Sequence, residues 1–366
     1  MVRQLAGSLT RAGLETHVAT TNDNGSGTLR VPHRVPVDQD GVTYWYFPRQ
    51  LRFYTVSWPL GAWLADHVAD FDVVHIHALF SYATLPAAYW SHQRGVPYIV
   101  RPLGTLNRWG MANRRPWMKK TSFRLLEARI VKHAALMHYT SEQERREAET
   151  LNVSTASVVI PNALPDAPKS AGLGVFRRRF PQLQGRRIVL FLSRLDEKKG
   201  LDLLLGAFAN VQSRVPDAAL VIAGDGSPDF VRQMKAGALA LGLEDVLWTG
   251  FLAGEEKEAA LADADVFTLP SYSENFGIAV AEAMAARLPV VVSDQVAIHK
   301  EIAEAGAGLV VPCDAAKLAD ALVVLLSDQQ NRRAMGLRGE AFVRRQYSSE
   351  AVTQQLIDAY NEVARA

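Results

Sequence analysis

The sequence predicts an α/β protein of two domains, each built around a parallel sheet. Short apolar runs alternate with helix-forming segments along nearly the whole chain, which is typical of parallel sheets covered by helices. A length of 366 residues, 48% of them hydrophobic, suits two domains with sizeable cores. Residues 161–174 hold three prolines and two glycines without periodicity, so we expect the linker there.

In the first half, residues 2–12 are predicted to be helical because Val2, Leu5 and Leu9 recur at helical spacing. Thr140 or Ser141 is expected to cap a helix that begins at Glu142. The expected strands are 15–20, 42–47, 73–77, 98–101, 136–139 and 157–160, and the other expected helices are 58–70, 85–92 and 116–133.

The second half has a more regular strand–helix rhythm. The expected strands are 188–193, 219–224, 246–250, 266–270, 290–293 and 308–312, the helices between them are 201–214, 229–241, 255–264, 278–286 and 297–304, and three helices close the chain, the last at 350–365. We therefore place one domain at 1–165 and the other at 175–345, followed by a C-terminal helix at 346–366.

Charge is distributed unevenly between the two halves. Residues 1–165 hold 18 Lys/Arg and 12 Asp/Glu, and the remainder holds 22 and 26 of the totals of 40 and 38. A basic first half and an acidic second half indicate different partners. No apolar run reaches transmembrane length, the first residues resemble a helix rather than a signal peptide, and the single Cys313 excludes an intrachain disulfide. A cytoplasmic protein is therefore expected.

The stretch 270–287 joins an apolar run to an Ala-rich helical segment through a polar loop. A strand, a loop of small residues and a helix N-terminus are the parts of a common phosphate site. If the helix begins near Gly277, Glu282 lies roughly 7 Å along its axis, so Glu274 and Glu282 flank the free backbone N–H groups. A nucleotide sugar, with an anion between two hydroxyl-bearing ends, fits this layout. The alternative is a surface loop with two solvated glutamates.

Other candidates follow strand ends. Arg194 and Lys199 come just after the strand at 188–193, where ligands bind in open α/β sheets, although a solvated loop would also carry them. The Asp-Ala-Asp pattern at 263–265 lies at a helix end that enters a buried strand, so it is interpreted as structural and no metal site is expected. His77 ends a buried strand without a set of zinc ligands, and is a candidate for contact with a substrate.

Residues 107–133 hold eight Lys/Arg against the single acid Glu127, with Trp, Met and Phe side chains interleaved. This composition favours an anionic membrane surface. A plain solvated helix is the next alternative. Nucleic-acid binding is the least favoured because no nucleic-acid motif is present.

These motifs, in this order, resemble the family 4 glycosyltransferases of the GT-B fold. The residues that carry the resemblance are Ser193-Arg194, Lys199-Gly200 and Asp202, then Gly224-Asp225-Gly226, Gly250-Phe251, Pro270-Ser271 with Glu274, Phe276 and Gly277, and Glu282-Ala283, with a looser likeness at 74–77 and 159–162.

The resemblance implies two Rossmann-like domains facing across a cleft, the first for the acceptor and the second for a UDP- or GDP-linked sugar donor. It also implies retaining, metal-independent hexosyl transfer without a cofactor, and a last helix that crosses back onto the first domain. The implied catalytic residues are Arg194, Lys199 and Glu274, the implied donor-binding residues are Asn275, Phe276, Gly277, Ile278, Glu282, Gly224, Phe251 and Leu252, and the acceptor side has His77, Arg101 and Gly104.

Three features depart from the family's pattern. The family opens with a strand and a Gly-rich loop, whereas this chain starts inside the helix at Val2, so the first domain apparently lacks its opening strand, and a start placed too late is the favoured explanation. Leu103 stands where many members have a histidine, which leaves the proton acceptor unassigned. Arg287 occupies a helix end that is usually glycine, where a left-handed backbone costs roughly 1 kcal/mol.

The leading hypothesis is a retaining glycosyltransferase that acts on a lipid-linked intermediate of a surface glycan or exopolysaccharide at the inner face of the plasma membrane. A catalytically impaired sugar-nucleotide-binding protein is the alternative, because of the missing strand and loop. A phosphorylase or sugar-nucleotide epimerase of the same fold is a third, which nothing in the sequence favours.

Overall fold

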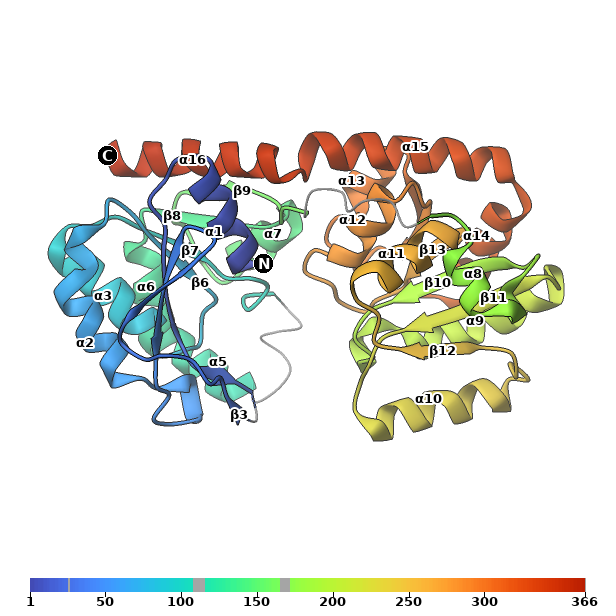
Figure 1. Ribbon diagram of the computed structural model, residues 1–366, viewed down its shortest axis with the longest axis horizontal. Helices are drawn as coiled ribbons and strands as arrows, with labels where there is room; N and C mark the ends of the chain where they lie inside the picture. Colours follow the sequence, from blue (N-terminus) through green and yellow to red (C-terminus); the bar gives the residue numbers. More distant parts are fainter. Residues whose placement is uncertain (26, 108–115, 165–171, 366) are drawn as a thin grey trace. The chain divides into compact units, whose positions relative to one another are not determined.

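The computed structural model describes residues 1–25, 27–107, 116–164 and 172–365. The chain forms two compact units (Figure 1). The first unit comprises residues 1–163 and 349–366, and the second comprises 164–348. The last helix, α16 (Ser349–Arg365), therefore belongs to the first unit although it ends the chain.

The strands of the first unit form two main sheets and a short hairpin. One sheet has the order β1-β5-β4, with β1 parallel and β4 antiparallel to β5, and the other is the parallel sheet β6-β7-β8-β9. Among the described residues no strand pairs with both β1 and β6. The strands are β1 (His17–Thr21), β2 (Asp23–Asn24), β3 (Gly27–Thr28), β4 (Pro36–Gln39), β5 (Val42–Phe47), β6 (Val74–His77), β7 (Tyr98–Arg101), β8 (Leu136–Tyr139) and β9 (Ser157–Val159).

Helices cover these sheets, and the last one packs on the first. Leu5 and Leu9 of α1 are buried in one apolar cluster with Val352 and Leu356 of α16. Ser141 caps α7, since its hydroxyl accepts the N–H of Glu144. The helices are α1 (Val2–Arg11), α2 (Trp58–His67), α3 (Thr84–Arg94), α5 (Pro116–Ser122), α6 (Ala128–His133), α7 (Glu142–Glu149) and α16.

The helix expected at 116–133 is interrupted by a π-helical turn, Phe123–Glu127, between α5 and α6. The carboxylate of Glu127 lies inside the protein, with 1% of the residue exposed, where it accepts hydrogen bonds from Tyr54 and Ser122. Arg108, Trp109, Met111, Arg114 and Arg115, which the sequence analysis counted in this basic segment, lie outside the described residues.

The second unit is a doubly covered parallel sheet with the order β12-β11-β10-β13-β14-β15. Its strands are β10 (Arg187–Leu192), β11 (Ala218–Ala223), β12 (Leu247–Gly250), β13 (Val266–Leu269), β14 (Val290–Ser293) and β15 (Gly308–Val311). Its helices are α8 (Val175–Arg179), α9 (Leu201–Arg214), α10 (Pro228–Ala240), α11 (Gly254–Asp263), α12 (Ile278–Ala285), α13 (His299–Glu304), α14 (Ala315–Ser327) and α15 (Gln329–Gln346). All strands expected from the sequence are present, with ends shifted by at most two residues.

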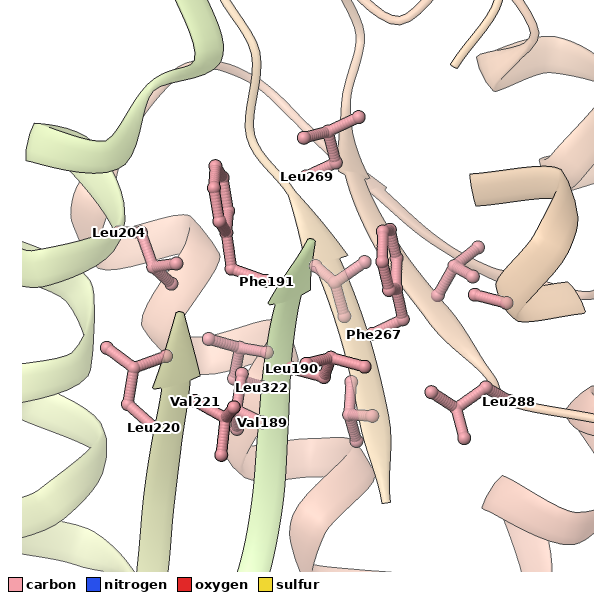
Figure 2. Close-up of a cluster of buried hydrophobic side chains, with 14 of the residues drawn as sticks. Val189, Leu190, Phe191, Leu204, Leu220, Val221, Phe267, Leu269, Leu288 and Leu322 are labelled. Carbon is pink, nitrogen blue, oxygen red and sulfur yellow. The ribbon is translucent and has the colours of Figure 1, made fainter. Parts of the chain in front are cut away.

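The core of this unit surrounds its two central strands. Leu190 and Phe191 of β10 and Phe267 and Leu269 of β13 are buried in a single apolar cluster (Figure 2). The strand order reverses between β10 and β13, because the chain runs outward to β11 and β12 before it returns. In open α/β sheets ligands bind at the carboxyl ends of strands at such a reversal. The loops after β10 and β13 are therefore the first place to look for a site.

Arg287, expected to be strained if left-handed, has φ 62° and so adopts that conformation. Its guanidinium donates to Glu340, with Nε 2.8 Å from Oε2. The hydrogen bond also raises the pKa of the guanidinium and lowers that of the carboxyl. The residue thus gains an ion pair that the usual glycine could not make.

Two buried histidines predict a pH-dependent stability of the first unit. His138 is 1% exposed, its Nδ1 lies 3.3 Å from Nε2 of His75, and Nδ1 of His75 lies 2.8 Å from the hydroxyl of Tyr360 on α16. Burial lowers the pKa of both rings well below 6.5. Both stay neutral in the folded protein when the unfolded chain protonates them, so stability is lost as the pH falls below 6.5.

We expect the unfolding free energy to be lower at pH 5 than at pH 7.5, because the unfolded chain takes up protons on these rings that the folded protein does not. Urea unfolding at the two pH values measures this loss. His138→Asn should reduce the difference and leave the part that comes from His75 and His77, whose pKa values burial also lowers. His67→Gln, at an exposed histidine, is the control. Equal stability at both pH values would contradict the assignment.

Candidate active site

The loops that follow β10 and β13 meet at the reversal of the strand order. The N–H of Tyr272 donates to the carbonyl of Lys198 over 2.8 Å. Gly200 has φ 66°, and a Cβ at this position would collide with the carbonyl oxygen of Pro270. Only glycine fits both the backbone conformation and the close approach. The residue before it, Lys199, is thereby brought against the second loop.

Lys199 and Glu274 form an ion pair across the two loops. Their side chains are 10% and 14% exposed, so the pair is largely withdrawn from water. The backbone of Glu274 is held on both sides, since its N–H donates to Gln295 over 3.0 Å and its carbonyl accepts the N–H of Ala297 over 2.9 Å. The carboxylate predicted at the sugar end of a donor therefore has a fixed position beside a cation.

Helix α12 begins next to this pair. Gly277, with φ 84°, is its N-cap residue, and Asn275 and Ile278 on either side are half-buried. The ring of Phe276 packs in the interior against Tyr347, with ring centroids 5.1 Å apart. The first N–H groups of a helix have no partner within it, and the helix dipole adds partial positive charge there. Together with Lys199, the helix start forms an environment suited to an anion.

Glu282 lies one turn into α12 and pairs with a residue that sequence reasoning missed. Its Oε1 lies 2.8 Å from Nζ of Lys257 on α11, and the two side chains are 19% and 28% exposed. Lys257 follows two glutamates on a helix with no motif, so nothing in the spacing distinguishes it from a solvated lysine. Each of the two predicted carboxylates of the site thus forms an ion pair with a different lysine.

Arg194 lies in the same loop as Lys199, but its side chain is more exposed to solvent. Its side chain is 66% exposed, with a guanidinium nitrogen 3.9 Å from Asp196. Burial lowers the pKa of Lys198, and the charges of Lys199 and Arg194 lower it further, against the opposing effect of Glu274. Three cations therefore share this loop, and Arg194 is not locked into the Lys199–Glu274 pair.

The turn after β11 lies beside the β10 loop through two glycines. Gly224 has φ 145°, its N–H donates to the carbonyl of Gly250 over 2.8 Å, and a Cβ there would collide with the carbonyl of Ser193. Beyond it, the N–H of Leu195 donates to Asp225 over 2.8 Å. The role of Gly224 here is to let two loops approach each other.

Phe251 and Leu252, the two residues expected beside the base of the donor, differ in solvent exposure. The ring of Phe251 is 70% exposed, whereas Leu252 is 7% exposed and belongs to the apolar core. The side chain of Leu252 thus packs in the interior, and the expectation that this loop borders the base stays a prediction. Only Phe251 presents a large apolar surface at this strand end.

The acceptor-side candidates of the first unit are mostly internal. Arg101 is 2% exposed and donates to the side chain of Asn162, and burial lowers its pKa to about 10. The N–H of Gly104 donates to the carboxylate of Glu144. Both residues therefore make internal hydrogen bonds, although Nε of Arg101 has no hydrogen-bond partner in the described part of the chain. Their assignment to the acceptor side stays a prediction.

His77, the candidate for contact with a substrate, is the last residue of β6. Burial, followed by the charge of Arg101, lowers its pKa to about 3, so it is neutral and weakly basic at physiological pH. Its Nδ1 has no hydrogen-bond partner in the described part of the chain. A histidine with this pKa is a poor proton acceptor, so His77 does not fill the role that Leu103 leaves unassigned.

Gly200→Ala tests the close approach of the two loops. The new Cβ meets the carbonyl of Pro270 in a left-handed conformation, so we expect the unfolding free energy to fall by at least about 1–2 kcal/mol. Displacement of Lys199 should also weaken anion binding. Urea unfolding and ligand-induced shifts in Tm measure both effects. Gly237→Ala in the middle of α10 is the control, because nothing lies within 4 Å of the new Cβ. It should not lower the unfolding free energy. Equal changes in unfolding free energy and in anion binding for the two variants would contradict the close approach of the two loops.

Two family models match the chain, one for each unit. A glycosyl transferase 4-like domain matches residues 1–163, and the glycosyl transferases group 1 model matches 176–342. A phosphatidyl-myo-inositol mannosyltransferase of Mycobacterium leprae is 32% identical over 317 residues, which cover 82% of this chain and 76% of that protein. The chain belongs to the group 1 glycosyltransferases.

A further sequence relative and a solved structure are also similar to this glycosyltransferase. A GDP-mannose-dependent alpha-(1-6)-phosphatidylinositol monomannoside mannosyltransferase of Mycobacterium tuberculosis is 34% identical over 200 residues, or 52% of this chain and 51% of that protein. The solved sucrose-phosphate synthase of Thermosynechococcus elongatus has a TM-score of 0.78 at 22% identity, over 99% of this chain and 92% of that one. The predicted α/β GT-B fold and the predicted family are confirmed.

Proposed function

We propose that this glycosyltransferase takes its sugar from a nucleoside diphosphate sugar held by the second unit. The observation that carries the proposal is the Lys199–Glu274 pair at the start of α12, with Glu282 on the same helix. The diphosphate would lie against the helix start. Glu274 would face the sugar, and Glu282 would accept hydrogen bonds from the ribose hydroxyls. Phe251 would border the base.

The positive charge for the departing diphosphate would come from protein groups. Arg194, Lys199 and the first N–H groups of α12 lie at one end of the sheet, and such preorganised donors stabilise charge as it develops. Arg194 is exposed and can turn toward a ligand, while Lys199 is already in place. Transfer should therefore proceed in the presence of EDTA, without metal or other cofactor.

We propose retention of configuration, a hexose as the transferred sugar, and a lipid-linked glycan acceptor. Two relatives support the acceptor class, since their names specify phosphatidyl-myo-inositol and its monomannoside. One of those names also specifies GDP-mannose, which makes a GDP-linked sugar the first donor to test and a UDP-linked sugar the second. The reaction would take place at the inner face of the plasma membrane, as part of surface-glycan synthesis.

A transfer assay tests the proposal. The full chain is incubated with GDP-mannose or UDP-glucose and a panel of lipid acceptors, with and without EDTA, and the product's anomeric configuration is read by NMR. Transfer with an axial linkage from an axial donor, unaffected by EDTA, is expected. Donor binding without transfer to any acceptor would favour the impaired sugar-nucleotide-binding protein. An inverted product would overturn the retaining chemistry.

A further inference from the structure

The surface of the first unit holds a loop whose large apolar side chains face water. Leu51, Phe53 and Trp58, in the segment before and at the start of α2, are 49%, 63% and 60% exposed. The loop is closed by a bridge between Leu51 and Val56, and the N–H of Gln50 donates to the carbonyl of Val56 over 2.9 Å. Residues 50–58 are therefore an ordered projection, called here the aromatic loop.

The conformation of the aromatic loop is costly and is held by a buried carboxylate. Tyr54 and Thr55 both have positive φ, 58° and 49°, a strained conformation that is uncommon outside glycine. The hydroxyl of Tyr54 donates to Glu127 and lies 3.0 Å from the hydroxyl of Ser122. Glu127 ends the π-helical turn between α5 and α6, and such turns are frequent at functional sites.

These hydrogen bonds hold the aromatic loop against the end of α5 and the π-helical turn. The outward face of that helical segment is also apolar in part: Trp117, Leu125 and Leu126 are 70%, 64% and 42% exposed. Phe123 and Ile130 of the same segment point into the core. Two neighbouring elements thus expose large apolar side chains while their other sides are packed.

The exposed charged side chains of these two elements are all positive. Glu127, which is buried, is the only acidic residue in 48–58 and 116–133. The exposed cations that make no ion pair within the described part of the chain are Arg52, Lys120, Arg124, Arg129 and Lys132. Exposed Trp, Phe and Leu among unpaired Lys and Arg are complementary to the headgroup region of an anionic bilayer, where rings enter the interface and cations meet phosphates.

We propose that the aromatic loop and residues 116–133 form one docking surface for an anionic lipid bilayer, with the Tyr54–Glu127 hydrogen bond holding the loop in its docking conformation. The proposal deepens the proposed function, because it gives a lipid-linked acceptor a membrane to which the enzyme is bound. No described helix combines the length and apolar character needed to cross a bilayer. Docking would therefore be through this surface.

Sedimentation of the full chain with vesicles tests the proposal. Binding to phosphatidylcholine vesicles with 30% phosphatidylglycerol is expected at low salt, with loss in 0.5 M NaCl and with pure phosphatidylcholine. Lys120→Gln/Arg124→Gln should raise the lipid concentration for half-binding about 25-fold, from two cations at about fivefold each. Phe53→Ser/Trp117→Ser should raise it at least about tenfold, since both rings leave the interface.

Matched controls lie on the second unit. Arg333→Gln/Arg345→Gln removes two exposed cations, and Leu239→Ser/Leu337→Ser removes apolar side chains that are 63% and 54% exposed. These variants should bind as the unaltered chain does, and far-UV circular dichroism confirms folding of all four. Tyr54→Phe, which removes only the hydroxyl, should weaken binding severalfold with an unchanged salt dependence.

Failure of the unaltered chain to sediment with anionic vesicles would overturn the proposal, as would equal loss in the test and control variants. Either result would favour a protein or nucleic-acid partner for this surface. Sedimentation requires neither donor nor transfer, so its failure leaves the proposed glycosyl transfer intact. Conversely, vesicle binding by a chain that transfers no sugar would keep the docking surface and overturn the function.

Discussion

Replacement of Lys199 by methionine is expected to lower kcat by about 10²–10³-fold, the typical cost of losing one preorganised donor to a developing anion. Lys199 is 8% exposed, and its position depends on Gly200 and on the ion pair with Glu274. Because this position is largely closed to solvent, water cannot easily replace the positive charge that the variant lacks. Initial rates with a saturating nucleotide sugar measure the loss.

A second variant separates chemistry from folding. Lys199→Met leaves Glu274 as a largely buried carboxylate without its partner, which lowers stability. Lys199→Met/Glu274→Gln removes that unpaired charge, so its Tm should recover while kcat stays low. Lys199→Arg keeps the charge and should lose less activity than methionine. Recovery of turnover in the double variant would show that the lysine only stabilises the fold.

Glu282→Gln should weaken donor binding about 10–100-fold while kcat changes little, because hydrogen bonds to a charged group contribute about 1.5–3 kcal/mol. Glu282 is proposed to hold the ribose hydroxyls, remote from the bond that breaks, so its contribution is the same in ground and transition states. Titration calorimetry with the nucleoside diphosphate alone, and KM against kcat with the sugar donor, measure the two quantities.

A matched control exists for this prediction in the same unit. Glu340 is 20% exposed at its side chain against 19% for Glu282, and both are ion-paired, Glu340 with Arg287 and Arg344 and Glu282 with Lys257. Glu340→Gln should leave donor binding unchanged. Lys257→Met should weaken binding by less than Glu282→Gln, since the carboxylate remains but is less well oriented. If Glu282→Gln lowered kcat and left KM unaltered, the ribose assignment would be wrong.

The sequence was informative where a local rule determines the structure. Alternation of apolar runs and helices placed the strands of the second unit and those of the first except β2, β3 and β4. A cap was expected at Thr140 or Ser141, just before Glu142, and Ser141 has that role. Glu274 and Glu282 were placed at either side of the α12 start from their spacing alone, and both lie there. Such features depend on neighbours along the chain.

Features that depend on contacts between distant residues were not predictable. Lys257 meets Glu282 only because α11 packs beside α12, and Leu252 enters the core although it follows an exposed phenylalanine. The π-helical turn depends on Tyr54, which lies some seventy residues upstream of Glu127 and closes a buried network there. The internal position of Arg101 likewise depends on Asn162, which lies beyond the next two strands.

The central claim is that the second unit binds a nucleoside diphosphate sugar at the start of α12, and titration calorimetry tests it most directly. GDP-mannose, GDP, UDP-glucose and UDP are titrated into the full chain and into Lys199→Met, Glu282→Gln and Glu340→Gln. The account predicts saturable binding of one nucleotide family, weakened by the first two changes and not by the third. Absence of binding by all four ligands, or binding that is indifferent to Lys199 and Glu282, would contradict it.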